Sequence, residues 1–183
     1  MDTETKEEIN KFIKESCEKL KVSNFVSATA KTIFYKAKTT ISDAEWETLA
    51  ATCIYLSCKI SELYIPPEKF KSIVSCDLSI ELETRIMKII DFNFNFFDIY
   101  QFVISVCKTL NFNAEEKVER LDKIFSDTRV NSVGFLGHAY EVKHVCLAVF
   151  EKNEVELFER VYCVEVDNVK IEEARRSLLL LDS

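Results

Sequence analysis

The chain has 183 residues, which suits one sizeable domain or two small ones. Its residues are 48% hydrophobic and 30% charged, as in ordinary globular proteins. It has only two glycines and two prolines, residues that β-sheets use freely at their tight turns, so helices joined by short loops are expected. The net charge of −7 disfavours nonspecific binding to a phosphate backbone and suits a protein partner with basic or mixed surfaces.

Apolar residues recur at helical spacing through the first ninety or so residues and predict five helices. Two stretches have the pattern of a capping box, Thr5-Lys6-Glu7-Glu8 for the first helix and Ser42-Asp43-Ala44-Glu45 for the third. Ser23 is expected to cap the second helix.

The fourth and fifth helices are predicted to be short. Pro66 and Pro67 suit the entry of the fourth helix, where a missing N–H costs nothing. The fifth helix is expected to be capped near Asp77 or Ser79.

The stretch at residues 49–62 (LAATCIYLSCKISE), in the third helix, is predicted to be the centre of the domain. In its first ten residues only Thr52 and Ser57 are polar, and both can return their hydroxyls to the backbone of their own helix. A helix that is apolar on nearly every side belongs in the middle of a bundle. The side chains change abruptly from apolar to polar at Lys59. Either the helix has simply left the core and reached water, or its buried part serves to hold the charges at its end rigidly at a surface.

Residues 92–100 (FNFNFFDIY) break the helical pattern and are predicted to be a packed, extended connector between two domains, since they contain no glycine or proline. Helical spacing restarts at Asp98. A second set of five helices is predicted, and its later members are expected after Asn113, at 140–154, and near Val155–Tyr162 and Val169–Leu181.

The seven cysteines contain no Cys-x-x-Cys pair, and five of them lie among apolar residues, so buried free thiols in a reducing, intracellular compartment are expected. The N-terminus is polar and acidic, unlike a secretory signal. The longest aliphatic run, at 178–181, is too short to span a bilayer, and no membrane association is expected.

The sequence contains no glycine-rich phosphate loop, metal cluster or local nucleophile signature, so neither catalysis nor a cofactor, metal or small-molecule ligand is expected. The two histidines, His138 and His144, are six positions apart and are interpreted as structural. A Cys–His pair that meets only in the fold stays open as an alternative.

Two segments resemble the heart of a cyclin box: LAATCIYLSCKISELYIPPEKF at 49–70 and LETRIMKIIDFNF at 82–94. The resemblance makes Lys59 the family's lysine, Glu83 its glutamate, and Phe92 with Phe94 its closing hydrophobic pair. With Ile60 and Glu62, these residues form the kinase-binding site that the resemblance implies: Lys59, Glu83, Ile60, Glu62, Phe92 and Phe94.

Residues 125–150 resemble, less strongly, the second repeat of transcription-associated cyclins (the C, H, K, L and T kinds). The first helix lacks the Met-Arg-x-x-Leu docking motif of cell-cycle cyclins, and Tyr35 stands where those cyclins carry an aspartate. Other departures are one missing acid in Lys59-Ile60-Ser61-Glu62 and the replacement of a His-Pro-Tyr opening by Phe97-Asp98-Ile99-Tyr100.

The resemblance implies an all-α cyclin fold of two consecutive five-helix bundles, at residues 1–97 and 98–183. The implied function is a nuclear regulatory subunit that docks on the C-helix of a cyclin-dependent kinase and promotes phosphorylation of the RNA polymerase II tail. The alternatives are a general transcription factor of the same fold or a scaffold without a kinase. Direct nucleic-acid binding is not expected, because the chain has neither a basic face nor a zinc ribbon.

Overall fold

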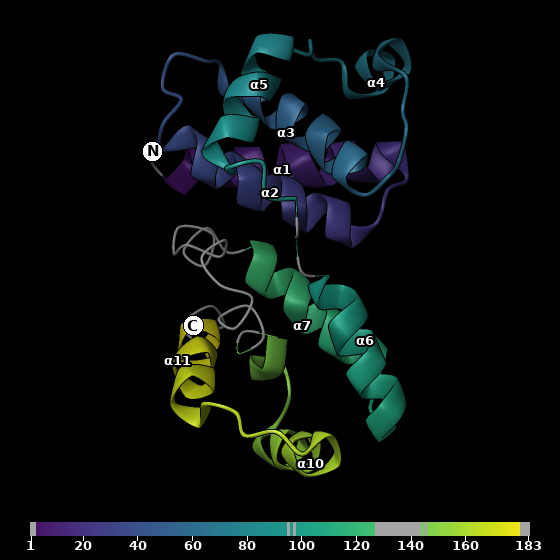
Figure 1. The fold of residues 1–183 in the computed structure, drawn as a ribbon, viewed down its shortest axis with the longest axis vertical. Helices are drawn as coiled ribbons and strands as arrows, with labels where there is room; N and C mark the ends of the chain where they lie inside the picture. Colours follow the sequence, from purple (N-terminus) through teal and green to yellow (C-terminus); the bar gives the residue numbers. More distant parts are fainter. Residues whose placement is uncertain (1–2, 95, 97, 127–143, 145, 180–183) are drawn as a thin grey trace. The chain divides into compact units, whose positions relative to one another are not determined.

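The structure is a computed structural model that describes residues 3–94, 96, 98–126, 144 and 146–179. All regular secondary structure in these residues is helical, which confirms the predicted all-α class (Figure 1). The chain divides into two compact units, Met1–Phe96 and Phe97–Ser183. The assignment of each half to a cyclin box stays a prediction.

The first unit contains the five helices that the apolar periodicity predicts. They are α1 (Thr3–Leu20), α2 (Asn24–Lys38), α3 (Trp46–Ile60), α4 (Pro67–Val74) and α5 (Ile80–Ile89). Helix α3 packs against α1, α2 and α5, and in Figure 1 these three helices surround it. The predicted central helix therefore is the one around which the unit is built.

Burial of α3 is continuous over ten residues, Leu49–Cys58. Its two polar side chains are satisfied within the helix, as expected: the Thr52 hydroxyl donates to the Thr48 carbonyl at 2.7 Å, and the Ser57 hydroxyl donates to the Cys53 carbonyl at 2.8 Å. A buried hydroxyl without such a partner would be costly, so these short polar side chains are compatible with the core.

The first expected capping box is wrong, because α1 begins at Thr3 and Thr5 is already inside the helix. The Lys and Glu residues around Thr5 are good helix formers, and they extend the helix toward the N-terminus. Ser23 does precede α2 and has the extended backbone of an N-cap (φ −69°, ψ 159°), but its side chain makes no capping hydrogen bond.

The second expected capping box, at residues 42–45, does not form either. Helix α3 begins at Trp46 after Glu45, which makes no side-chain capping bond. The carboxylate of Asp43 is instead bound by both terminal nitrogens of Arg85 in α5, at 3.0 and 2.8 Å. Local spacing could not indicate this contact, because 42 positions separate the two residues.

The expected starts of the fourth and fifth helices are confirmed. Pro66 occupies the N-cap of α4 and Pro67 its first helical position. At α5 the cap is Ser79 and not Asp77, since the Ser79 hydroxyl accepts a hydrogen bond from the Leu82 N–H at 3.1 Å.

The second unit contains four long helices among the described residues: α6 (Ile99–Leu110), α7 (Ala114–Ser126), α10 (Lys152–Tyr162) and α11 (Asn168–Leu179). Residues 144 and 146–148 are helical as well. The predicted restart at Asp98 is confirmed, because its carboxylate accepts a hydrogen bond from the Gln101 N–H at 2.9 Å and caps α6.

The helix predicted at 140–154 does not run to its expected end. The chain leaves the helical conformation at residues 149–151, and residues 140–143 lie outside the described part of the chain. Glu151 and Glu154 form a reciprocal capping box that starts α10 at Lys152. The Glu151 N–H donates to the Glu154 carboxylate at 2.6 Å, which is the bond that a glutamate at the third helical position supplies in a capping box.

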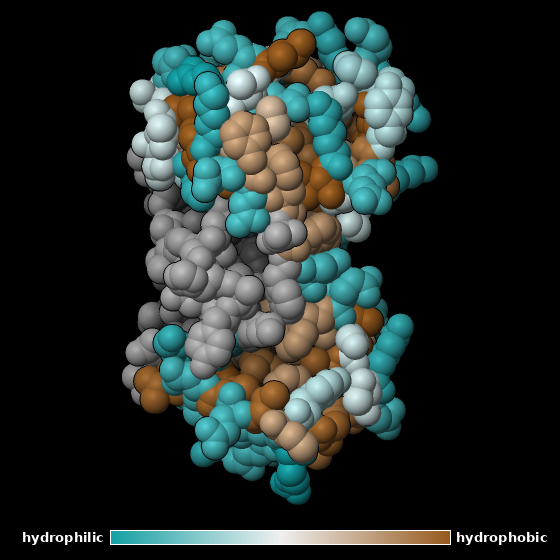
Figure 2. Space-filling view, viewed as in Figure 1, coloured by the Kyte–Doolittle hydropathy of each residue, from teal (hydrophilic) through white to brown (hydrophobic). Residues whose placement is uncertain are grey.

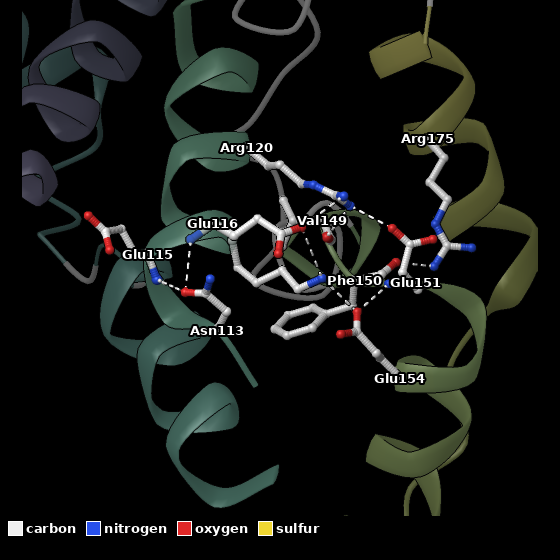
Figure 3. Close-up of polar contacts among 10 residues, drawn as sticks. Asn113, Glu115, Glu116, Arg120, Val149, Phe150, Glu151, Glu154 and Arg175 are labelled. Atoms are coloured by element: carbon white, nitrogen blue, oxygen red, sulfur yellow. Dashed lines mark hydrogen bonds and ion pairs between the residues drawn. The ribbon is translucent and has the colours of Figure 1, made fainter. Parts of the chain in front are cut away.

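A network of charges around this capping box joins α7 to α10 and α11 (Figure 3). Lys117 is only 3% exposed, and its ammonium binds the Glu154 carboxylate at 2.8 Å and lies 5.7 Å from the Phe150 ring centre. Arg120 of α7 binds the Glu151 carboxylate at 2.8 Å. Arg175 of α11 donates to the Phe150 carbonyl. The segment that contains Phe150 and Glu151 is thus bound by α7 through Arg120 and by α11 through Arg175.

Candidate partner-binding surface

Lys59 and Glu83 are brought together by the ends of two helices. Lys59 lies in the last turn of α3, immediately after its buried residues, and Glu83 lies in the first turn of α5. The distance from Lys59 Nζ to Glu83 Oε1 is 2.6 Å although 24 positions separate them. The Lys59 ammonium also lies 4.7 Å from the centre of the Tyr55 ring, within range of a cation–π interaction. Both contacts hold the lysine at one place.

The C-terminus of α3 is closed by a tight turn that passes through Glu62. Glu62 has a left-handed backbone (φ 58°), and its N–H donates to the Lys59 carbonyl at 3.0 Å. The Leu63 N–H donates to the Cys58 carbonyl at 2.8 Å. This pair of bonds is the Schellman pattern, which satisfies the last helical carbonyls and fixes the direction of the chain that follows. The Glu62 side chain is exposed, and Ile60 is half-buried.

Phe92 and Phe94 follow the C-terminus of α5 and are exposed, at 55% and 43%. Asp91 and Phe92 both have left-handed backbones, with φ of 56° and 51°. This conformation costs a residue with a Cβ roughly 1–2 kcal/mol. The cost is met here by hydrogen bonds, since the Phe92 N–H donates to the Met87 carbonyl at 2.9 Å. The chain therefore holds an aromatic ring in solvent on a fixed backbone.

Three exposed residues near this site were missed by the sequence reasoning: Leu63 at 40%, Tyr64 at 82% and Ile80 at 83%. All exposed large hydrophobic residues described in the first unit lie at the ends of α3 and α5, and they are Leu63, Tyr64, Ile80, Phe92 and Phe94. Figure 2 shows brown and tan side chains at the surface of this unit. One signal in the sequence could have found Ile80, because it lies outside the apolar stripe that Leu82 and Ile86 form.

Catalytic and metal-binding groups do not gather at this surface. Among the described residues no group of three or more His, Cys, Asp or Glu side chains could hold a metal, and none of the helices is both long and apolar enough to cross a membrane. Burial raises the pKa of the Cys17 thiol to about 12 and that of Cys58 to about 11, which keeps both thiols protonated and unreactive. His144 is buried, and His138 lies outside the described residues.

Comparison with known proteins agrees with this arrangement. The family model described as the cyclin N-terminal domain matches residues 1–113, more than half of the chain. The match includes all five helices of the first unit and both members of the Lys59–Glu83 pair. No curated protein was found to match the sequence. The chain belongs to the cyclin family.

Proposed function

We propose that the chain is the regulatory subunit of a cyclin-dependent protein kinase and binds it with the surface at the ends of α3 and α5. The observation that carries this proposal is the 2.6 Å contact between Lys59 and Glu83, on two helices whose flanking residues include every exposed large hydrophobic residue described in the first unit. An apolar surface with a fixed polar centre is typical of a protein interface.

The mechanism is a shift in population. A kinase is active when a glutamate of its C-helix pairs with the lysine of its third strand, and alone it spends most of its time with that helix swung out. A partner favours the active state only by the difference between its affinities for the two states. Because α3 is buried over ten residues, its end is held firmly by the core, and we propose that it binds the swung-in C-helix better than the swung-out one.

Within this surface the charged pair and the apolar residues have different tasks. Lys59 and Glu83 neutralise each other, and their remaining donors and acceptors are free to bind the backbone of a partner helix. Ile60, Phe92 and Phe94 supply apolar area, which provides most of the affinity at an interface. Glu62, exposed beside the pair, is placed to meet a basic side chain.

We further propose that the kinase acts in the nucleus on the transcription machinery, with the RNA polymerase II tail as its substrate. The first helix has no Met-Arg-x-x-Leu motif, and the Tyr35 hydroxyl donates to Asn10 of α1 at 3.2 Å, where cell-cycle cyclins carry an aspartate. Tight binding of peptides with an Arg-x-Leu docking motif would contradict this assignment. Imaging of the tagged chain in its own cells tests the nuclear location.

The test of the proposed function is to mix the pure chain with purified cyclin-dependent kinases and to measure phosphoryl transfer to a polymerase-tail peptide. The chain alone is expected to transfer no phosphate, and at least one kinase is expected to become active only with the chain. The proposal fails if no kinase binds or responds. A DNA retardation assay at physiological salt tests the alternative of a general transcription factor, because such a factor would bind the DNA and slow its migration.

A further inference from the structure

Tyr64 and Ile80 are the two most exposed large hydrophobic residues of the described chain, at 82% and 83%, and neither belongs to the core of the first unit. Single exposed hydrophobics are common on protein surfaces and need no explanation. These two differ because of where they lie. Ile80 begins α5, the helix of Glu83, and Tyr64 follows the C-terminus of α3, the helix of Lys59.

Ile80 is the first residue of α5 and precedes Glu83 by three positions. Residues three apart in a helix share a face and differ in height by about 4.5 Å, so Ile80 lies one turn from the ion pair and on the same side. Met87, four residues after Glu83, continues this face and is half-buried. The face thus carries an apolar residue on each side of the charge.

Tyr64 lies beside the other member of the pair. The Leu63 N–H is bonded to the carbonyl of Cys58, the residue before Lys59, at 2.8 Å. Tyr64 follows directly, so it leaves the turn within a few residues of Lys59 and at the same end of α3. Pro66 then restricts the backbone of Ile65 to extended conformations.

Both side chains are therefore carried on backbone that is ordered before any partner arrives. Ile80 is held by the Ser79 cap, and Tyr64 lies between the closing turn of α3 and Pro66. An isoleucine and a tyrosine have few rotatable bonds, so little conformational freedom is lost when they are covered. Ordered apolar side chains of this kind form the best anchors at interfaces.

We infer that Tyr64 and Ile80 determine which kinase the chain selects, an inference that rests on the proposed function. Hydrogen bonds from Lys59 and Glu83 to a helix backbone are available from every kinase, because every backbone has the same groups. Apolar side chains meet the partner's own side chains, which differ between kinases. The occupant of this surface is the C-helix of a kinase whose apolar residues fit on both sides of the ion pair.

The test is a titration of the full chain against a set of purified cyclin-dependent kinases with different C-helix sequences. The variants are Tyr64→Ser, Ile80→Ser and Glu83→Ala, and the matched control is Val169→Ser, which removes an apolar side chain 68% exposed in the second unit. Thermal melts check that each variant stays folded, as is usual for exposed positions.

Tyr64→Ser and Ile80→Ser are each expected to raise the Kd of the best-binding kinase about tenfold and the Kd of the other kinases less. The ratio between the Kd values of the different kinases then becomes smaller. Glu83→Ala is expected to weaken all of them by similar factors, and Val169→Ser none. Equal losses for all kinases, or no loss, in the Tyr64 and Ile80 variants would overturn the inference while the proposed function stands. If the wild-type chain binds no kinase, both fall.

Discussion

Removal of the Glu83 carboxylate, as in Glu83→Ala, separates a structural role of the ion pair from a role in binding. In the free chain the Lys59 side chain is 44% exposed and the Glu83 side chain 16%. An ion pair this accessible to water contributes only about 0–1 kcal/mol to folding. Lys59 would still lie over the Tyr55 ring, a contact worth about 0.5–1 kcal/mol at an exposed site. The variant is therefore expected to melt close to the wild type.

Binding changes the environment of the same pair. When a kinase covers the ends of α3 and α5, Lys59 loses water, and without Glu83 its charge is desolvated and unpaired. Truncation of one member of a buried pair costs roughly 2–5 kcal/mol in affinity. This corresponds to a loss of about thirtyfold to several thousandfold in Kd.

The chain contains a matched control on the same helix. Arg85→Ala removes another exposed ion pair of α5, the one with Asp43, whose side chains are 36% and 66% exposed. Arg85 is two positions from Glu83 and so points to another side of the helix. The measurements are a thermal melt of each free variant and a titration against the kinase. Normal binding by Glu83→Ala, or an equal loss in Arg85→Ala, would refute the reasoning.

Three further predictions concern the second unit and the thiols. Glu154→Ala leaves Lys117 buried without its closest partner and is expected to destabilise the chain by about 3–5 kcal/mol in chemical denaturation, whereas Lys117→Met should cost much less. The Arg120 guanidinium lowers the pKa of Glu151 below its usual value of about 4.5, so the ionised carboxylate stabilises the fold above that pH and the stabilisation is lost as the pH falls. Glu151→Gln should therefore make the free energy of unfolding depend less on pH in the acid range. An unchanged pH dependence would count against the Arg120–Glu151 pair. A thiol reagent should modify the exposed Cys163 fastest in the native chain and the five buried cysteines only on unfolding, and Cys163→Ser should remove that fast phase.

The first unit could be predicted closely because its helices depend on local periodicity. Continuous burial of Leu49–Cys58 follows from a segment with no large polar residue, and the Ser79 cap from a hydroxyl before an apolar stripe. Both signals lie within a few residues of the structure that they specify. The meeting of Lys59 and Glu83 came from the family resemblance, since no local spacing places them together.

Failures arose where distant contacts outweigh local preference. Asp43 in the expected capping box binds Arg85, 42 positions away, and α3 begins later than its motif suggests. The exposure of Tyr64 and Ile80 likewise depends on how α3, α4 and α5 pack. For Ile80 the sequence does carry one signal, its place outside the apolar stripe of Leu82 and Ile86, whereas no local pattern indicates the exposure of Tyr64.

The binding free energies of the ion pair and of the apolar residues can be compared with the free energy that activation of a kinase requires. To move a kinase from 1:99 to 99:1 in favour of its active state, a partner must bind that state about 5.5 kcal/mol more tightly. The roughly 2–5 kcal/mol lost on truncating one member of the pair is largely the penalty of the charge left unpaired, so the intact Lys59–Glu83 pair contributes less than this and falls short alone. The exposed apolar residues beside it must supply the remainder, and full burial of one large apolar side chain contributes about 1.5–3 kcal/mol. A cyclin surface with the ion pair but without Tyr64, Ile80 or Phe92 should therefore bind a kinase weakly and activate it incompletely.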